Sequence, residues 1–430
     1  MKTSFLLAWR TLLRGRFMPL LLLGAAAVML LMPSIIRSDG TISGARELYI
    51  HSILGSVIAL VFLSVLCAAC GHLAKEREAH RLSLAVIRPS DAFRMMLGVW
   101  FAYVSATAAT LAVIAVAIYL RAPGGAVPCR HHIPPILPSP MSIALASIDE
   151  YLARPSTPDE VRKLPRNSIL AHMAANEADR FEAIAPNSSA SWNFPAQWTF
   201  CPDLRIQVRF ATQFSARAPF SGEFSFGASR AVVSNNTQSV IEVPLSFGKG
   251  EIPLANIAAA QTAAVFKNTG PETIMLRPRK DLFILAPADS FAANLFRAML
   301  HSLSGIALAA AFGLFLSSAL SRPVATFTAL VTVAVIFIAP NVIDQLPDGA
   351  GQPLGDRIGL LLSRGIHAVT ASFTDASPIS DLAENRCIEW PTLIRAVGVD
   401  AFLLPLAFLG LGTFLVRRKA LPDANQGLRI

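Results

Sequence analysis

Charged residues are scarce in this chain. Only 15% of its 430 residues are Asp, Glu, Lys or Arg, whereas 53% are hydrophobic and the mean hydropathy is +0.51. A soluble domain carries about 25% charged residues, so the shortage predicts a mostly α-helical protein embedded in a lipid bilayer. The net charge of +9 is explained by the distribution of Lys and Arg across the membrane, and we expect no nucleic-acid partner.

Catalytic and nucleotide-binding motifs are also missing. The sequence has no H-E-x-x-H, no G-x-S-x-G and no G-x-x-x-x-G-K-[ST] loop, and "FGKGEIP" (247–253) lacks the required spacing. "CRHH", from Cys129 to His132, groups three potential metal ligands, but no second pair follows at zinc-site spacing. We therefore predict a surface loop there, no metal, no catalytic residue and no cofactor bound by this chain.

Cysteines are few, and they divide between two settings. Cys67 and Cys70 fall in an apolar run, where small buried residues are expected rather than a redox pair, because nothing nearby would lower a thiol pKa. Cys129, Cys201 and Cys387 fall in segments expected outside the membrane, where disulfides persist. A Cys129–Cys201 disulfide is one candidate, and the odd number of cysteines leaves the pairing open.

Long apolar runs are abundant. A helix crosses a hydrocarbon core about 30 Å thick with roughly 20 residues. Six runs meet this requirement, which predicts six transmembrane helices. They are Phe17 to Ile36, Ile53 to Leu73, Met95 to Leu120, Phe296 to Leu320, Pro323 to Ile343 and Leu393 to Val416.

The N-terminal run is preceded by Lys2, Arg10, Arg14 and Arg16, as in a signal peptide. It is longer than the apolar core of a signal peptide and ends without a small-x-small cleavage site. We therefore expect an uncleaved anchor.

The distribution of Lys and Arg predicts the orientation, because cytoplasmic loops are enriched in both. With the N-terminus inside, the inner segments are 1–16, 73–98, the turn at 321–323 and the tail from 417, and they carry four, five, one and four Lys or Arg residues. The outer segments 37–51 and 344–392 carry two and three. Both termini are therefore expected in the cytoplasm.

A polar segment from 121 to 290 separates the third and fourth predicted spans and is large enough for a domain. Its Pro-rich start (121–140) is expected to be irregular, and 147–164 to form short helical pieces broken at Pro155 and Pro158. After about 183, period-two alternation predicts an antiparallel, sandwich-like β domain. The alternating stretches are "LRIQVRFATQF", "GEFSFGAS", "SVIEVPLSF" and "ETIMLRP".

Ionisable residues lie near the outer ends of two predicted spans. Arg297 and His301 open the fourth span, and Arg395 and Asp400 open the sixth. We interpret them as interface anchors that extend toward water. A solute pathway is the alternative.

The second and third predicted spans are joined by "LAKEREAHRLSLAVIRPSDAFRMMLG", Leu73 to Gly98. Charges cluster from Ala74 to Leu84, and Pro89 disfavours a helical Arg88. Ser90 can then cap a new helix. The pattern predicts a short amphipathic helix displayed at the cytoplasmic face within 73–95, where a soluble partner can bind.

This loop resembles the cytoplasmic loop of ABC type-2 transporter permeases, in which an acidic patch precedes a Leu-rich segment, a Pro and a new helix. Glu76 or Glu78, Leu84, Pro89 and Gly98 match that order. The resemblance implies that Glu76, Glu78, Leu84, Arg88 and Pro89 couple to a separate cytoplasmic ABC ATPase, which alone hydrolyses ATP.

Other features agree with this family. They are an amphipathic N-terminal helix ("SFLLAWRTLLRG") and an outer segment (344–392) in which 356–373 is amphipathic but too short to span. His80-Arg81 and Val99 depart from the family pattern. The resemblance implies a bacterial inner-membrane exporter subunit that pairs with a second permease subunit, with residues 1–120 and 291–430 forming its membrane part.

A second interpretation is a membrane-anchored extracytoplasmic binding or adhesion protein that works through its β-rich domain. The size of the 121–290 segment favours it. One or two spans would anchor such a domain equally well, so six predicted spans favour the permease.

Overall fold

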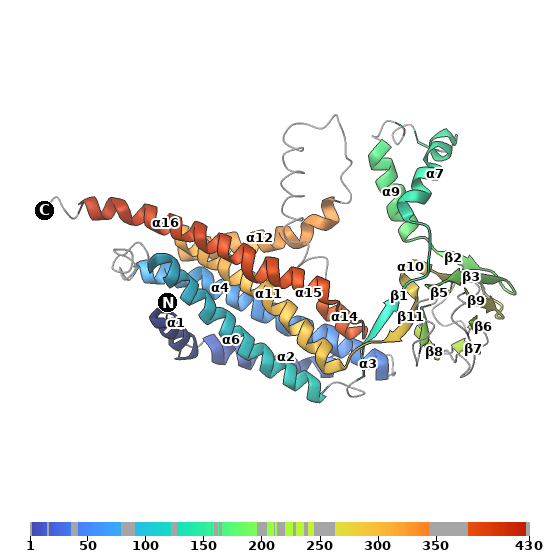
Figure 1. Cartoon of the computed structure of the whole chain (residues 1–430), viewed down its shortest axis with the longest axis horizontal. Helices are drawn as coiled ribbons and strands as arrows, with labels where there is room; N and C mark the ends of the chain where they lie inside the picture. Colours follow the sequence, from blue (N-terminus) through green and yellow to red (C-terminus); the bar gives the residue numbers. More distant parts are fainter. Residues whose placement is uncertain are drawn as a thin grey trace, which may run out of the picture. The chain divides into compact units, whose positions relative to one another are not determined.

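The computed structural model describes residues 2–14, 17–35, 42–78, 91–121, 127–155, 157–158, 162, 166–195, 204–209, 211–212, 220–226, 229–235, 240–244, 263–343 and 377–426. The protein is mostly helical with small sheets (Figure 1). The described residues form two compact units. The helical unit comes from 1–127, 290–343 and 377–426, and the mixed unit from 128–289.

The helical unit contains long apolar helices and shorter connecting ones. Its N-terminal elements are α1 (Lys2–Arg14), α2 (Phe17–Ile35), α3 (Ile42–Leu48), the π-helical turn η1 (Tyr49–Leu54), α4 (Gly55–Glu78) and α6 (Asp91–Arg121). Its C-terminal elements are α11 (Phe291–Ala319), α12 (Arg322–Ile343), α14 (Pro378–Ala383), α15 (Trp390–Ala396), the π-helical turn η4 (Val397–Leu403) and α16 (Leu404–Gln426).

Four helical stretches among the described residues are long and apolar enough to cross a membrane: Ala45–Arg77, Ala92–Arg121, Phe291–Ala319 and Trp390–Arg418. They coincide with the second, third, fourth and sixth predicted spans, so the prediction of apolar helices long enough to span is confirmed for these four. The first and fifth predicted spans are the helices α2 and α12. Their described apolar parts are shorter, Leu20–Met32 and Arg322–Ile336.

The helix α11 lies at the centre of the helical unit and is the most deeply buried of the four long helices. It begins after Ser290, whose hydroxyl accepts a hydrogen bond from the Ala293 N–H at 3.3 Å, a typical N-cap. Its neighbours are α4, α6, α12, α16 and η4, which leaves little of its surface for lipid.

The mixed unit holds eleven described strands in three antiparallel sheets. The sheet orders are β1-β11-β4-β8, β2-β10-β5 and β3-β9-β6-β7. The strands are β1 (Arg130–Ile133), β2 (Glu182–Ile184), β3 (Ser189–Asn193), β4 (Arg205–Arg209), β5 (Ala211–Thr212), β6 (Phe220–Phe226), β7 (Ser229–Asn235), β8 (Val240–Pro244), β9 (Ala263–Asn268), β10 (Ile274–Leu276) and β11 (Leu282–Pro287). Three helices accompany them, namely α7 (Pro140–Ala153), α9 (Arg166–Ala178) and the short α10 (Pro278–Asp281).

One hydrophobic core joins all three sheets. Trp192, Ile206, Phe224, Phe266 and Ile274 are among its buried residues, and they come from different strands. Alternation of buried and exposed positions, as in β9 and β10, is what places these side chains on one face. The mixed unit therefore has a core of its own.

The strand predictions from alternating sequence are confirmed, since β4, β5, β8 and β10 fall within the predicted stretches and β6 overlaps "GEFSFGAS". The helix α7 ends at Ala153, ahead of Pro155, as predicted. The prediction of an irregular segment at 121–140 is wrong in part. Residues Arg130–Ile133 form β1, which pairs with β11 from Arg130↔Pro287 to Ile133↔Ile284, so "CRHH" is not a surface loop.

Candidate functional site

The long helices bring a set of charged residues to one end of the helical unit. α4 and α11 run in the same direction, because Ala69 meets Gly313 and Ala74 meets Ser317. α6 runs the opposite way, and the Trp100 indole N–H donates to the Ala307 carbonyl at 2.8 Å. The end of α4, the start of α6, the end of α11 and the start of α12 therefore lie together. We call this the basic end. It carries Lys75, Arg77, Arg94 and Arg322.

At the basic end α4 is fastened to α11. A Cβ atom at Gly313 would lie 2.8 Å from the Cβ of Ala69 and 3.0 Å from the carbonyl oxygen of Leu66, so only glycine allows this approach. The Ala74 N–H donates to the Ser317 hydroxyl at 3.0 Å, and the Arg77 guanidinium donates to the Leu320 carbonyl at 2.9 Å. Movement of the end of α4 therefore involves the end of α11.

A groove of about 630 Å³ opens along α4 toward the basic end. Its polar wall includes His72 and Tyr103, whose Nδ1 and hydroxyl lie 3.3 Å apart. The other lining residues are Thr11, Leu12, Leu20, Leu21, Leu60, Ser64, Cys67, Ala68, Gly71, Lys75, Glu76 and Arg322.

The predicted ATPase-coupling residues belong to this end only in part. Glu76 lies on α4 and lines the groove, and Glu78 is the last residue of α4. Leu84, Arg88 and Pro89 lie outside the described residues. The predicted new helix after Ser90 is present, since α6 begins at Asp91.

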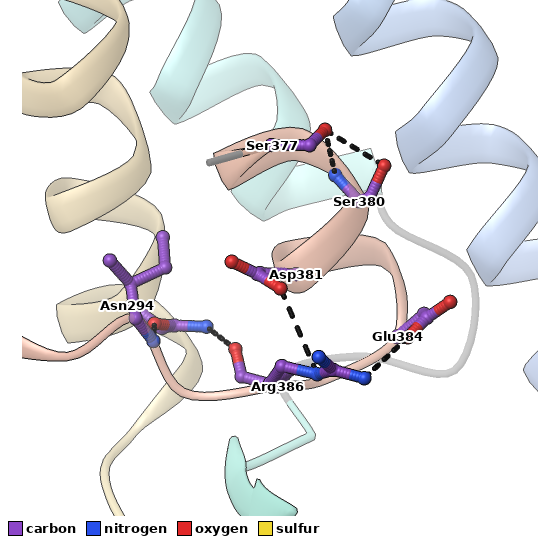
Figure 2. A network of polar contacts seen from close by, with 7 residues as sticks. Asn294, Ser377, Ser380, Asp381, Glu384 and Arg386 are labelled. Carbon is purple, nitrogen blue, oxygen red and sulfur yellow. Dashed lines mark hydrogen bonds and ion pairs between the residues drawn. The ribbon is translucent and has the colours of Figure 1, made fainter. Parts of the chain in front are cut away.

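At the opposite end of the helical unit, Asn294 of α11 holds the segment that leads into α15. Its amide nitrogen donates to the Arg386 carbonyl at 2.8 Å, and its amide oxygen accepts from the Ile388 N–H at 2.9 Å. Figure 2 shows Asn294 beside Arg386, whose guanidinium reaches back to Asp381 and Glu384. The side chain of Asn294 is fully buried, so its two hydrogen bonds are made away from water.

Deeper along α11, ionisable residues are buried among the helices. Arg297 is 5% exposed, His301 2% and Asp400 0%. Arg297 donates to the Ile388 carbonyl at 3.3 Å and to Cys387 Sγ at 3.1 Å, and its guanidinium lies 4.5 Å from the ring centre of Trp390. The prediction that these three residues extend to the interface is wrong, because helix packing encloses them. Arg395 alone is exposed.

Asp400 lies in the π-helical turn η4, which packs against α11. π-Turns within α-helices occur frequently at functional sites, and buried ionisable residues within membrane helices are costly and mark pathways or switches. We call Asn294, Arg297, His301 and Asp400 the polar layer. The sequence shows Arg297, His301 and Asp400 as ionisable residues within predicted spans, but it does not show that helix packing buries them.

Burial raises the pKa of Asp381, on the short helix α14, to about 6. Arg386 opposes this shift by attraction, while Glu384 and Glu389 add to it by repulsion. The Asp381–Arg386 pair, with Oδ1 and Nε 3.7 Å apart, therefore only partly offsets the cost of removing the carboxylate from water.

The predicted cysteine roles stand as follows. Cys70 is fully buried in α4 and Cys67 lines the groove. Cys129 is buried, and its backbone N–H donates to the Asp289 carbonyl at 2.9 Å. Cys201 lies outside the described residues, so its pairing with Cys129 stays a prediction.

Within the described ranges, no group of three or more His, Cys, Asp or Glu residues is placed to hold a metal ion. Comparison of the whole chain with protein-family models, with characterised proteins and with solved structures finds no match.

Proposed function

We propose that this chain is the permease subunit of an ABC exporter, driven by a separate cytoplasmic ATPase that docks on residues 73–95. The observation that supports the proposal most is the attachment of the end of α4 to α11 at the basic end. The docking segment begins in the last turns of α4, where Ala74 and Arg77 are hydrogen-bonded to Ser317 and Leu320. A force applied to the loop is therefore passed directly to the central helix.

The central helix carries that force to the polar layer. Asn294, Arg297 and His301 lie on α11 itself, and Asp400 packs against it from η4. Buried polar groups in lipid have few alternative partners, so a shift of α11 exchanges one set of hydrogen bonds for another. In this mechanism ATP hydrolysis in the partner moves α4 and α11 together, and rearrangement of the polar layer opens a path for solute. The chain itself contributes no catalytic residue and binds no cofactor.

The proposal includes six spans, with α2 and α12 completing the set, and a second permease subunit in the membrane. Both termini and the basic end face the cytoplasm of a bacterial inner membrane, because Lys and Arg concentrate there. The 121–290 segment then lies outside. The resemblance implies an amphipathic solute such as a lipid, glycan or drug.

Orientation is tested by single cysteines in a chain without its native ones. An impermeant thiol reagent added outside should label a cysteine at Asn187, in the turn between β2 and β3, and should spare one at Arg94. Labelling of the Arg94 position from outside contradicts the orientation and the docking argument together.

The function is tested by purifying the full chain from its native membrane in mild detergent and identifying co-purified proteins by mass spectrometry. We expect an ATPase with a G-x-x-x-x-G-K-[ST] loop, and we expect ATP hydrolysis by the pair to exceed that of the ATPase alone. Recovery of the intact chain with no ATPase, from membranes that contain several, contradicts the proposal.

A second candidate function rests on the mixed unit. Its core is its own, as expected of a domain that can present a binding surface independently. If the chain is an adhesion or binding protein, cells that carry residues 128–289 on an unrelated membrane anchor should retain the function. If the chain is a permease, those cells should lose it.

A further inference from the structure

The groove along α4 changes in character from one end to the other. Leu60, Ser64, Cys67, Gly71 and Lys75 line it in order, which is the spacing of one face of a helix. Leu20 and Leu21 of α2 also line the groove. The next turn of α2 approaches Leu60, because a Cβ atom at Gly24 would lie 3.0 Å from the Leu60 Cδ2. The groove becomes cationic at the basic end.

Two cations converge on the polar mouth of this groove. Lys75 is contributed by α4 and Arg322 by α12, and both are exposed. Neither side chain makes a hydrogen bond or ion pair within the described parts of the chain. Gly71 leaves room for Arg322, because a Cβ atom there would lie 3.1 Å from the Arg322 Nε. With Glu76 as the third charged group at the mouth, the sum of formal charges is +1.

The length of the groove fits one leaflet of a membrane. Lys75 lies fifteen positions after Leu60 on α4, which is a rise of roughly 22 Å at 1.5 Å per residue. Half of a bilayer, headgroup region included, measures about 20–22 Å. The apolar part of the groove thus lies at acyl-chain depth when the two cations lie at headgroup depth.

We propose that this groove binds one anionic phospholipid, with its phosphodiester between Lys75 and Arg322 and an acyl chain along Leu60 and the leucines of α2. Charge-assisted hydrogen bonds from Arg and Lys to phosphate are strong and directional. A zwitterionic lipid brings a second cation to the same mouth and gains less. The groove shares Lys75 and Glu76 with the 73–95 segment proposed to dock the ATPase, so lipid binding is measured without the ATPase.

A second groove of the helical unit provides an internal comparison. It lies between α6 and α11, has a volume of about 420 Å³, and is lined by apolar residues apart from the Tyr119 hydroxyl. It can take an acyl chain but offers no cation, so it should not distinguish headgroups.

The test uses the full chain purified in detergent without any ATPase, titrated with phosphatidylglycerol or phosphatidylcholine and followed by native mass spectrometry. We expect the wild type to prefer phosphatidylglycerol. The double variant Lys75→Gln with Arg322→Gln should lose affinity for phosphatidylglycerol by about tenfold or more, because charged hydrogen bonds are lost. Its affinity for phosphatidylcholine should be unchanged. Arg94→Gln removes one positive charge at the same end, outside the groove, and should keep the wild-type preference.

Gly71→Leu adds bulk at the mouth without changing charge, and it should weaken phosphatidylglycerol binding while the protein stays monodisperse. Glycerol phosphate, which has the anion but no acyl chain, should not displace the lipid. The proposal is overturned if the double variant keeps the wild-type preference or if Arg94→Gln loses it equally. Displacement by glycerol phosphate also overturns it, because the groove would then be a site for a soluble phosphate.

Discussion

Ser317 on α11 accepts a hydrogen bond from the backbone N–H of Ala74 on α4 at 3.0 Å, although 243 positions separate the two residues. One turn further along α4, Arg77 donates to the Leu320 carbonyl, across the same separation of 243 positions. The two contacts fasten the helix that leads into the predicted docking loop to the most buried helix of the protein. Several expected outcomes depend on this attachment and on the polar contacts at the other end of α11.

Gly313→Ala should destabilise the helical unit, because the new methyl group would lie 2.8 Å from the Ala69 Cβ and 3.0 Å from the Leu66 carbonyl oxygen. Overpacking of this kind costs about 1–3 kcal/mol, measurable as a lower thermal midpoint in detergent. Gly410→Ala is the matched control, since nothing lies within 4 Å of its added Cβ. Equal midpoints for both variants would show that α4 and α11 separate without cost.

Glu76→Lys combined with Glu78→Lys should abolish capture of the ATPase, because like charges across an interface cost several kcal/mol. Insertion in the membrane should be unchanged, as no apolar span is altered. Glu150→Lys, on the exposed face of α7, has the same type of charge change and should capture the ATPase normally. Wild-type capture by the double variant would remove the main support for the docking assignment.

Pro89→Ala should also reduce ATPase capture, through conformation rather than charge. Without Pro89, Arg88 is free to adopt a helical conformation, and the predicted turn before α6 is lost. The measurement is ATPase recovered per inserted chain. A Pro89→Ala chain that recovers as much ATPase as the wild type would contradict the predicted turn.

Asn294→Leu should release the segment from 386 to 388, because it removes partners from the Arg386 carbonyl and the Ile388 N–H. Each buried group left without a partner costs about 1–3 kcal/mol. Hydrogen exchange should therefore accelerate at Ile388. Ser380→Ala, which removes an exposed hydroxyl on α14, should leave exchange at Ile388 unchanged, and protection that survives Asn294→Leu would refute the role of Asn294.

The α14 region should lose stability as the pH rises from about 4 to about 6. The folded-state pKa of Asp381 is raised to about 6 by burial, above the unfolded value of about 3.9. The folded state therefore binds more protons within this window, and the penalty, at most about 3 kcal/mol, is complete above pH 6. Asp381→Asn should abolish the slope when exchange of residues 378–388 is compared with the wild type at each pH. A slope that persists in Asp381→Asn would assign it to another group.

Residues 128–289 expressed alone should fold as a β-rich unit, because one core joins the three sheets. Circular dichroism should show a strand-rich spectrum and a cooperative melt. Gly222→Leu should prevent that melt, since even a Cβ atom at this position would lie 2.3 Å from the Phe266 ring. A spectrum that is mostly helical would contradict an independent β domain.

Local patterns in the sequence were sufficient for the long apolar helices and for five of the strands. An apolar run long enough to span lipid forms a helix wherever it lies, because the backbone must satisfy its own hydrogen bonds. α4, α6, α11 and the stretch from α15 to α16 follow from that requirement. Period-two alternation likewise predicted β4 and β6, since it needs only one buried face.

The tertiary structure decided what depends on distant partners. β1 forms in a Pro-rich stretch because β11, more than 150 residues later, supplies its hydrogen bonds. Arg297 and Asp400 occupy positions near the predicted span ends, where an isolated helix would let them reach water, but packing of η4 and α15 on α11 encloses them. The groove between Lys75 and Arg322 exists because α12 returns along α4. Burial and proximity of this kind are properties of pairs of segments, and hydrophobic pattern within one segment does not contain them.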